Sequence, residues 1–346
     1  MNEVKKKILF LTSTGVHSGG ERITLNIASA MNRRGYSVLY AGLAGPIQDF
    51  AHDADVPFYQ MKKLTLREVR RIIRVFKPDV IHAADFRASL VSVILRRKTI
   101  AHLHHDADWL SSVNPYSLAT ALIVKRSQRT ICVSATIMEQ YCLAGRFKKN
   151  MMVLPNVVDL NEIRVCSKEF VGDKKQYDIA YLGRLSEEKA PVRFVHIIKQ
   201  IKERMDVHAV MIGDGALRSQ VEQEVAKNGL KENVVLLGNL PDPFPVLAQS
   251  KLLIIPSLRE GFGLAAVEAM ALGLPVLASN VGGLKTIVTP ACGELCSTEQ
   301  EFAVCAIDLL LEDTLWAKKS LAAVERAEQF GNVSAYYDKM EKLYNE

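Results

Sequence analysis

The segment from residue 256 to residue 268 has the residue types and spacing of a phosphate-binding turn. It reads PSLREGFGLAAVE and follows the apolar run Leu252–Ile255. This order predicts a buried strand, a turn bracketed by Gly261 and Gly263, and a helix that begins near Leu264. Glycine permits positive φ angles and close approach of a ligand to the backbone. The first N–H groups of the helix and the positive end of its dipole would then bind a phosphate without any side chain.

Two carboxylates belong to the same segment. Glu260 lies in the predicted turn, and Glu268 lies about two turns into the helix. A carboxylate that accepts hydrogen bonds from hydroxyl groups suits a sugar or a ribose, so the pair could bind different ends of one elongated ligand. Alternatively, they are an ordinary turn residue and a solvent-facing helix residue. Their position at the carboxyl end of a strand, with glycines between them, favours ligand binding.

A second candidate segment, GRLSEEK, spans residues 183–189 and directly follows the predicted strand 178–182. Its two cations, Arg184 and Lys189, would lie at the mouth of the same sheet. A planar guanidinium and a compact ammonium could share a diphosphate there. Alternatively, Lys189 pairs at the surface with Glu187 or Asp214.

A glycine pair also follows the first predicted strand of the chain. The residues SGGER, 18–22, open the first predicted helix. The G-x-G-x-x-G spacing is absent, and no acidic residue ends the second strand, which disfavours a nicotinamide cofactor. The turn around Gly20 could still close over the phosphates of a ligand.

Histidines cluster at the end of the predicted strand 99–103, where the sequence reads HLHHD. His102 and His104 would share one face of the strand, so with Asp106 they could ligate a metal ion, as in metallo-hydrolases. The metallo-β-lactamase pattern requires a histidine where Ala107 stands. Two other interpretations remain, a packed strand end and a histidine that faces a cleft as a polar catalytic group.

The elements that position these residues follow from an alternation of short apolar runs with longer segments of helical periodicity. This alternation predicts parallel sheets covered by helices on both faces. A length of 346 residues favours two domains. In such sheets ligands bind at the carboxyl ends of strands, where the turns described above should meet. The predicted strands are 8–12, 37–41, 79–82, 99–103 and 130–133 in the first sheet, and 178–182, 208–212, 234–237, 252–255 and 275–278 in the second.

Charge differs between the two parts of the chain. Residues 1–165 hold 24 lysines and arginines against 13 acidic residues, net +11, whereas the remainder holds 20 against 25, net −5. The predicted helix 65–77 carries a basic face that would attract an anionic membrane or an acidic acceptor, although solvated helix faces give the same pattern. No nucleic-acid-binding module is recognisable. The cations of that face are Arg67, Arg70, Arg71, Arg74 and Lys77.

Targeting and redox signals favour a cytoplasmic protein. No apolar run approaches the roughly 18 residues of a membrane span, and the run after the first lysines is too short for a secretion signal. The six cysteines show no C-x-x-C spacing, which favours reduced packing residues. We therefore expect a cytoplasmic location, with contact to the inner face of the plasma membrane through the basic surface.

Taken together, these motifs resemble glycosyltransferase family 4, whose retaining enzymes have the GT-B fold of two facing Rossmann-like domains with a cleft between them. The most specific part of the resemblance is the pair Glu260 and Glu268, seven residues apart and followed by AMALGLPV. The resemblance implies an acceptor-binding domain at 1–165, a nucleotide-sugar-binding domain at 166–330, and a helix at 331–346 that crosses back to the first domain. The other matching segments are Gly19–Arg22, His104, Pro155–Asp159, Gly183–Lys189 and Gly213–Gly215.

The resemblance also implies roles for single residues. Arg184 and Lys189 would bind the donor diphosphate, Glu268 the ribose, and Glu260 the hydroxyls of the transferred sugar. His104 would lie near the reacting carbon. Other expected donor contacts are Gly20, Gly213, Leu240, Gly261, Phe262, Gly263 and Leu264, with Leu240 near the base.

Two departures from the family pattern affect what the resemblance implies. Val157 stands where many members have glycine, which affects the expected hinge, and Ala84 replaces a second histidine, which affects the expected acceptor pocket.

The expected activity is metal-independent, retaining transfer of a hexosyl-type sugar from a UDP- or GDP-sugar to a saccharide or lipid-linked acceptor. Such a reaction belongs to the biosynthesis of cell-surface polysaccharide or glycolipid. A sugar phosphorylase or sugar-phosphate synthase on the same scaffold is an alternative. A nucleotide-sugar-binding module without catalysis and a metallo-hydrolase are two others.

Overall fold

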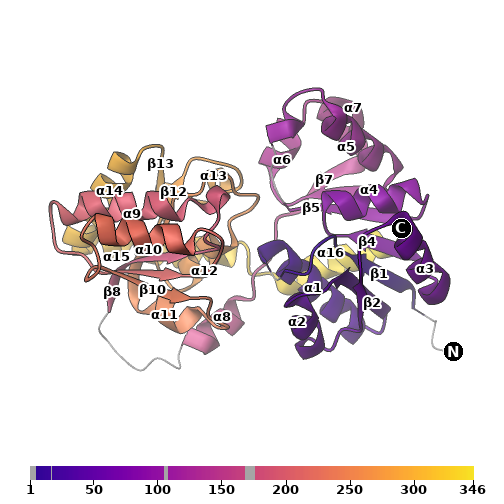
Figure 1. The fold of residues 1–346 in the computed structure, drawn as a ribbon, viewed down its shortest axis with the longest axis horizontal. Coiled ribbons are helices and arrows are strands. Elements are labelled where there is room, and N and C mark those ends of the chain that lie inside the picture. The colour runs from indigo at the N-terminus through magenta and orange to yellow at the C-terminus, as the bar shows by residue number, and fades with distance from the viewer. Residues whose placement is uncertain (1–4, 17, 105–107, 168–175) are drawn as a thin grey trace. The chain divides into compact units, whose positions relative to one another are not determined.

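The computed structural model describes residues 5–16, 18–104, 108–167 and 176–346, which form two compact units (Figure 1). Unit 1 comprises Met1–Val157 and Val333–Glu346, and unit 2 comprises Val158–Asn332. The division lies before helix α8 (Leu160–Ser167), which contacts helices of unit 2. The boundary therefore lies before the one expected between residues 165 and 166, because the buried Leu160 and Ile163 anchor α8 in unit 2.

Unit 1 contains a parallel sheet of seven strands in the order β3-β2-β1-β4-β5-β6-β7. All five strands predicted for this sheet are present. The two additional strands, β3 and β7, are four and three residues long and lie at the two edges of the sheet. The strands are β1 Lys7–Leu11, β2 Ser37–Leu43, β3 Phe58–Met61, β4 Val80–Ala83, β5 Thr99–Leu103, β6 Arg129–Cys132 and β7 Met151–Val153.

Helices cover this sheet, and α3 (Leu66–Phe76) illustrates why they form. Thr65 caps its first turn by accepting a hydrogen bond from Glu68 N at 3.2 Å. Val69 and Ile73 are buried in a cluster with strand residues, while the arginines face outward. The other helices of unit 1 are α1 Gly19–Arg33, α2 Ile47–Asp53, α4 Phe86–Ile94, α5 Pro115–Arg126, α6 Ala135–Gln140, α7 Ala144–Phe147 and α16 Val333–Asn345, with the short turns η1 Asp108–Leu110 and η2 Lys148–Asn150.

The helix at the end of the chain, α16, packs on the sheet of unit 1 beside α1. It buries Met340 and Tyr344 completely. Arg34, after α1, forms ion pairs with Asp338 at 2.7 Å and Glu341 at 2.6 Å. Burial of these apolar side chains is the main source of its attachment, since partly exposed ion pairs contribute little.

Unit 2 contains a parallel sheet of six strands in the order β10-β9-β8-β11-β12-β13. The five predicted strands are present, and β13 is an additional edge strand. The strands are β8 Tyr177–Leu182, β9 Ala209–Ile212, β10 Val234–Gly238, β11 Ser250–Ile255, β12 Val276–Ser279 and β13 Gly293–Cys296. The helices are α8, α9 Pro191–Lys202, α10 Arg218–Lys227, α11 Phe244–Ala248, α12 Leu264–Ala271, α13 Leu284–Ile287, α14 Glu299–Leu311 and α15 Asp313–Glu328, with the short turn η3 Glu187–Lys189.

The core of unit 2 lies between its sheet and the helices α9 and α14. Ile179 and Ile254 from the sheet pack in one cluster with Phe194 of α9 and Phe302 of α14, and all four side chains are fully buried. This core fixes the strand ends from which the candidate site is built.

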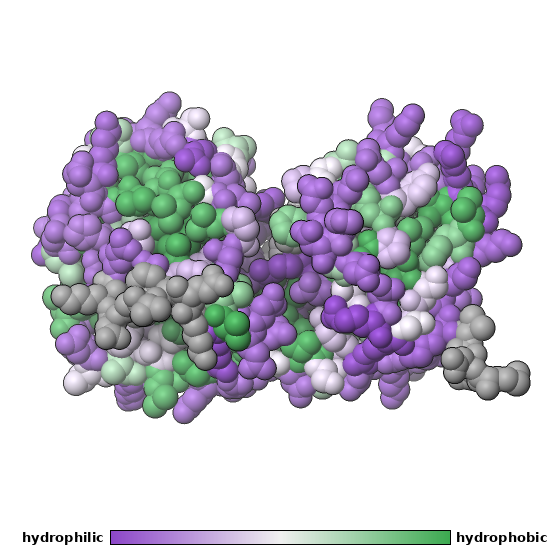
Figure 2. Space-filling model, turned by 90° about the horizontal axis from the view of Figure 1, so that it is seen from below, coloured by the Kyte–Doolittle hydropathy of each residue, from purple (hydrophilic) through white to green (hydrophobic). Residues whose placement is uncertain are grey.

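Hydrophilic side chains cover much of the face shown in Figure 2, with smaller apolar patches on each unit. In the part of the chain that the structure describes, no helix is both long enough and apolar enough to cross a membrane.

Candidate functional site

The two predicted phosphate-binding segments of unit 2 lie side by side. They follow β8 and β11, which are neighbouring parallel strands. The backbone N–H groups of Leu258 and Arg259 donate to the carbonyl oxygen of Glu188 at 2.8 and 3.3 Å. Because of these bonds, the turn after β11 is attached to the turn after β8.

The two candidate diphosphate-binding cations have carboxylate partners. Lys189 Nζ lies 2.5 Å from Glu260 Oε2, and both side chains are mostly buried. Arg184 pairs with Glu188, four residues further along, and is about half exposed. The alternative that Lys189 pairs at the surface with Glu187 or Asp214 is therefore wrong, because Lys189 pairs with Glu260.

The glycine turn leads directly into α12. Gly263 has φ +109°, and a Cβ there would come within 2.8 Å of Leu284 Cδ2. Gly283, which follows β12, supports the turn because its N–H donates to Glu260 O at 2.9 Å. A Cβ on Gly283 would lie 2.5 Å from Phe262 O, so only glycine fits there. Gly283 was not among the residues predicted for the site, although the glycine pair after β12 is a signal for such a position.

The glutamate of α12 does not face solvent. Glu268 is 4% exposed, on a helix whose residues 266–271 are all buried. The alternative of a solvent-facing helix residue is therefore wrong for Glu268. A carboxylate is buried in this way only where polar partners satisfy it.

A third loop packs against the turn after β8. Gly213 has φ +136°, and a Cβ there would lie 2.0 Å from Gly183 O. Leu185 N donates to Asp214 O at 2.9 Å, and Gly213 N donates to Gly238 O at 2.7 Å. The strands β10, β9, β8 and β11 are neighbours in the sheet, and the loops at their carboxyl ends thus meet at one edge of it.

The remaining donor-binding candidates of unit 2 belong to the same loops. Leu240 lies two residues beyond β10 and is partly buried. Gly261 and Phe262 are buried in the turn after β11, and Leu264 begins α12. The structure therefore brings all the unit 2 candidates to the carboxyl edge of one sheet.

Gly20 and His104 come together in unit 1. A Cβ on Gly20 would lie 3.2 Å from His104 Cβ, so the first turn of α1 packs directly on the histidine. Thr24 Oγ1 lies 3.3 Å from His104 Nε2 and donates to Gly20 O at 2.9 Å. His104 is 7% exposed and follows β5 directly. Its ring is thus held by α1 at the carboxyl edge of this sheet.

Two further histidines lie buried beneath His104. The rings of His102 and His104 are 4.0 Å apart. His102 Nδ1 lies 3.2 Å from His82 Nε2, and His82 Nδ1 lies 2.7 Å from the Tyr344 hydroxyl of α16. Burial lowers the pKa of His82 to about 3 and that of His102 well below its usual range, so both rings are neutral near pH 7.

The metal-ligand interpretation of the histidine cluster depends partly on residues 105–107, which lie outside the described residues. Within the described ranges, no group of three or more potential ligands is suitably placed for a metal ion. His102 contacts His82 inside the core, which is the arrangement of a packed strand end. His104 is the histidine of this strand that remains at the sheet edge.

Comparison with known families identifies the chain. A model described as Glycosyltransferase Family 4 matches residues 17–162, and one described as Glycosyl transferases group 1 matches residues 166–330. The chain belongs to glycosyltransferase family 4. It is a glycosyltransferase with the GT-B fold, which confirms the resemblance and the fold class inferred from the sequence.

Relatives of this glycosyltransferase occur in bacteria and archaea. An uncharacterized glycosyltransferase of Methanocaldococcus jannaschii is 28% identical over 250 residues, which cover 65% of this chain and 60% of that protein. The UDP-Gal:alpha-D-GlcNAc-diphosphoundecaprenol alpha-1,3-galactosyltransferase of Escherichia coli is 25% identical over 319 residues, 82% of each chain. Among solved structures, Anabaena HepE in complex with UDP-glucose has a TM-score of 0.84 at 21% identity and covers 97% of this chain and 98% of its own.

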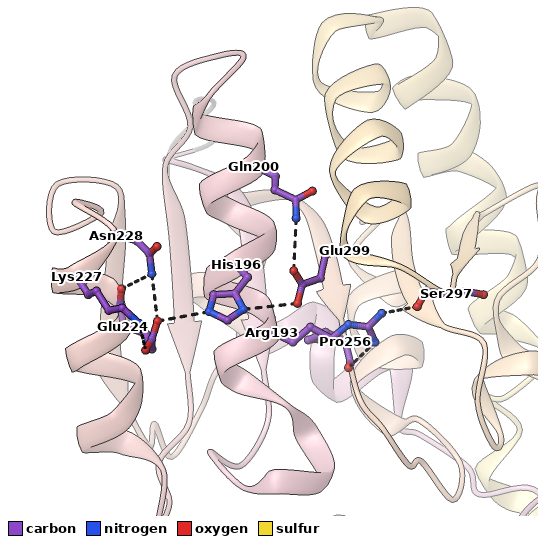
Figure 3. Close-up of polar contacts among 9 residues, drawn as sticks. All are labelled: Arg193, His196, Gln200, Glu224, Lys227, Asn228, Pro256, Ser297 and Glu299. Carbon is purple, nitrogen blue, oxygen red and sulfur yellow. Dashed lines mark hydrogen bonds and ion pairs between the residues drawn. The ribbon is translucent and has the colours of Figure 1, made fainter.

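Arg193 supports the strand ends of this glycosyltransferase and was not among the residues predicted from the sequence. It lies in α9, and its guanidinium donates to Pro256 O at 3.3 Å, Ser279 Oγ at 3.1 Å and Ser297 O at 2.6 Å. Figure 3 shows Arg193 pointing toward Pro256 and Ser297, away from the cluster of His196 with Glu224 and Glu299. One side chain thus ties together the carboxyl ends of β11, β12 and β13. The sequence holds no motif for this role, because the three partners are distant along the chain.

Proposed function

We propose that this glycosyltransferase moves a hexosyl-type sugar from a UDP- or GDP-sugar to a saccharide or lipid-linked acceptor, with retention and without a metal ion. The observation that supports the proposal best is the convergence of four strand-end loops in unit 2, which brings Arg184, Lys189 and the start of α12 to one sheet edge. Two cations and a helix N-terminus suit a diphosphate.

The leaving nucleoside diphosphate gains negative charge as the bond to the sugar breaks. In the proposed mechanism, Arg184, Lys189 and the first N–H groups of α12 stabilise that charge, which is the work a divalent cation performs in other transferases. The acceptor hydroxyl attacks the reacting carbon on the face that the diphosphate leaves, and its proton passes to the departing phosphate. The configuration at that carbon is retained, as the family resemblance implies.

The Lys189–Glu260 contact suggests how donor binding orders this site. A diphosphate that binds Lys189 competes with Glu260 for the ammonium group. Glu260 is then able to accept hydrogen bonds from the hydroxyls of the sugar, while Glu268 binds the ribose. His104 in unit 1 is the proposed polar group for the sugar near its reacting carbon.

We base our proposals for the nucleotide and the cellular role on the names of relatives. The Escherichia coli relative is named for a UDP-linked galactose, and HepE was solved with UDP-glucose. These names favour UDP over GDP for this chain, and biosynthesis of a cell-surface polysaccharide or glycolipid as its role. We place the protein in the cytoplasm, with the basic surface of unit 1 against an anionic membrane.

Product analysis tests the proposal. The purified protein is incubated with UDP- and GDP-hexoses and a panel of acceptors that includes inorganic phosphate, with and without EDTA. We expect a glycosylated acceptor with the anomeric configuration of the donor, unaffected by EDTA. A sugar phosphate as the product would indicate a phosphorylase or synthase. An inverted anomer would contradict retention. A complete lack of donor turnover would favour a nucleotide-sugar-binding module without catalysis.

A further inference from the structure

Unit 1 contains a cavity of about 360 Å³ at the carboxyl edge of its sheet. Ser13 follows β1, Leu43 ends β2, and Lys63 follows β3, so the ends of three neighbouring strands contribute to it. The strand order reverses between β1 and β4, which is where ligands of doubly wound sheets bind. Its volume lies within the range of small-molecule sites.

Aliphatic side chains form most of the wall of this cavity. Leu43 ends β2, Leu64 lies three residues beyond β3, and Leu90 and Val91 come from α4. All four also pack against buried residues of unit 1 or are themselves partly buried, so they are held in place. A ligand that fills the cavity must therefore present apolar surface to this wall.

Two cations complete the lining. Lys63 and Arg87 are exposed, and neither has a carboxylate partner within the described ranges. Arg184 and Lys189, in contrast, both pair with carboxylates. Two unpaired cations beside an aliphatic wall attract an anionic group that is attached to an apolar one.

Asp85 is a carboxylate that contacts this lining, and it is already engaged. Asp85 accepts hydrogen bonds from Ser13 N at 2.6 Å, from Thr12 Oγ1 at 3.2 Å and from Ala88 N at 2.9 Å. These donors compensate its charge and fix it as the N-cap of α4. The charged side chains that line the cavity, Lys63 and Arg87, therefore make it cationic.

From this chemistry we infer that the cavity binds the phosphate or diphosphate of a lipid-linked acceptor together with the first part of its apolar chain. Lys63 and Arg87 bind the phosphate oxygens, and the side chains of Leu43, Leu64, Leu90 and Val91 contact the chain. This inference rests on the proposed function, because it specifies the acceptor class of that reaction. A free saccharide fits poorly, since hydroxyls that face four aliphatic side chains lose hydrogen bonds to water without replacement.

Binding of three probes to the full-length protein tests the inference. Farnesyl diphosphate carries both charge and chain, farnesol carries only the chain, and inorganic pyrophosphate carries only the charge. Each is titrated calorimetrically with saturating UDP or GDP present, so that the diphosphate site of unit 2 is blocked. The variants are Lys63→Gln with Arg87→Gln, and as a control Arg70→Gln with Arg74→Gln, two exposed arginines of α3 that do not line the cavity.

We expect farnesyl diphosphate to bind at least 10-fold more tightly than either other probe. The Lys63→Gln, Arg87→Gln variant should lose at least 10-fold in affinity, and the control should change less than 2-fold. Equal binding by this variant and wild type would overturn the inference, as would pyrophosphate binding as tightly as farnesyl diphosphate. UDP and GDP affinities measured alone report on unit 2, so failure of the proposed donor site is recognised separately.

Discussion

Lys189 Nζ lies 2.5 Å from Glu260 Oε2, although 71 positions separate the two residues in the sequence. The contact joins the cation proposed to bind the diphosphate to the carboxylate proposed to bind the sugar. Because opposite charges attract at this distance, the contact holds the side chain of each residue against the other. The contact makes the two halves of the proposed donor site mutually dependent.

Replacement of Glu260 by glutamine should separate nucleotide binding from transfer. We expect Glu260→Gln to lower kcat by about 100-fold, because the side chain that accepts hydrogen bonds from the sugar hydroxyls loses its negative charge. Affinity for UDP or GDP should stay the same or rise, because Lys189 loses a competing carboxylate. Steady-state kinetics and calorimetry measure the two effects. Glu188→Gln, which releases Arg184 in the same way, serves as the control and should retain transfer. Equal losses in affinity and transfer for Glu260→Gln would argue against the assigned roles.

His104 should affect the chemical step without affecting nucleotide affinity. We expect His104→Ala to lower kcat by about 100-fold while UDP or GDP affinity changes less than 2-fold, since the donor-binding cations belong to unit 2. Thr24→Val removes the hydroxyl 3.3 Å from His104 Nε2 and should have a smaller effect in the same direction. An unchanged kcat in His104→Ala would remove His104 from the mechanism.

The buried histidines should make the protein sensitive to acid. Burial lowers the folded-state pKa of His82 from 6.5 to about 3, and that of His102 also falls. Below pH 6.5 the unfolded chain therefore binds protons that the folded chain excludes, and stability falls as pH decreases toward 3. At pH 5 the loss is about 2 kcal/mol for His82 alone.

Thermal unfolding between pH 7.5 and 4 measures this loss. The variant His82→Gln with His102→Gln should show a weaker pH dependence than wild type, whatever its stability at neutral pH. His52→Gln removes an exposed histidine of the same unit and should leave the dependence unchanged. A pH dependence that survives in the double variant would assign the acid sensitivity to other groups.

Gly213 should tolerate no side chain. Alanine there would bring Cβ within 2.0 Å of Gly183 O and would also hold φ at +136°, so we expect a loss of about 3 kcal/mol or more. Gly229→Ala is the matched control, because Gly229 has φ +69° but no atom within 4 Å of the added Cβ. It should lose only about 1 kcal/mol. Equal melting temperatures for the two variants would contradict the close packing of these loops.

Much of the fold could be predicted because the central strands are continuous apolar runs that alternate with helical periods. The strands that escaped prediction, β3, β7 and β13, are short and lie at sheet edges, where partial exposure weakens the apolar pattern. The domain boundary expected between residues 165 and 166 lies several residues beyond the observed one. The structure instead places the division at Val157 and Val158.

Local motifs were sufficient to name the loops of the candidate site, but not the contacts between them. Arg184 and Lys189 were visible beside a strand end, whereas the pairing of Lys189 with Glu260 depends on β8 and β11 being neighbours. Arg193 shows the same limit, since its partners belong to three segments that only the folded sheet brings together. Contacts of this kind follow from strand order, which is not a property of any local segment.

The most direct measurement concerns the two cations beside the glycine turn. UDP and GDP are titrated calorimetrically into wild type, into Arg184→Met with Lys189→Met, and into Lys227→Met with Lys231→Met, a control that removes two exposed lysines elsewhere in unit 2. We predict that the first variant loses affinity and kcat/KM by about 100-fold or more, while the control stays within 2-fold of wild type. Nucleotide affinity and turnover that match wild type in the Arg184→Met, Lys189→Met protein would contradict the proposed donor site.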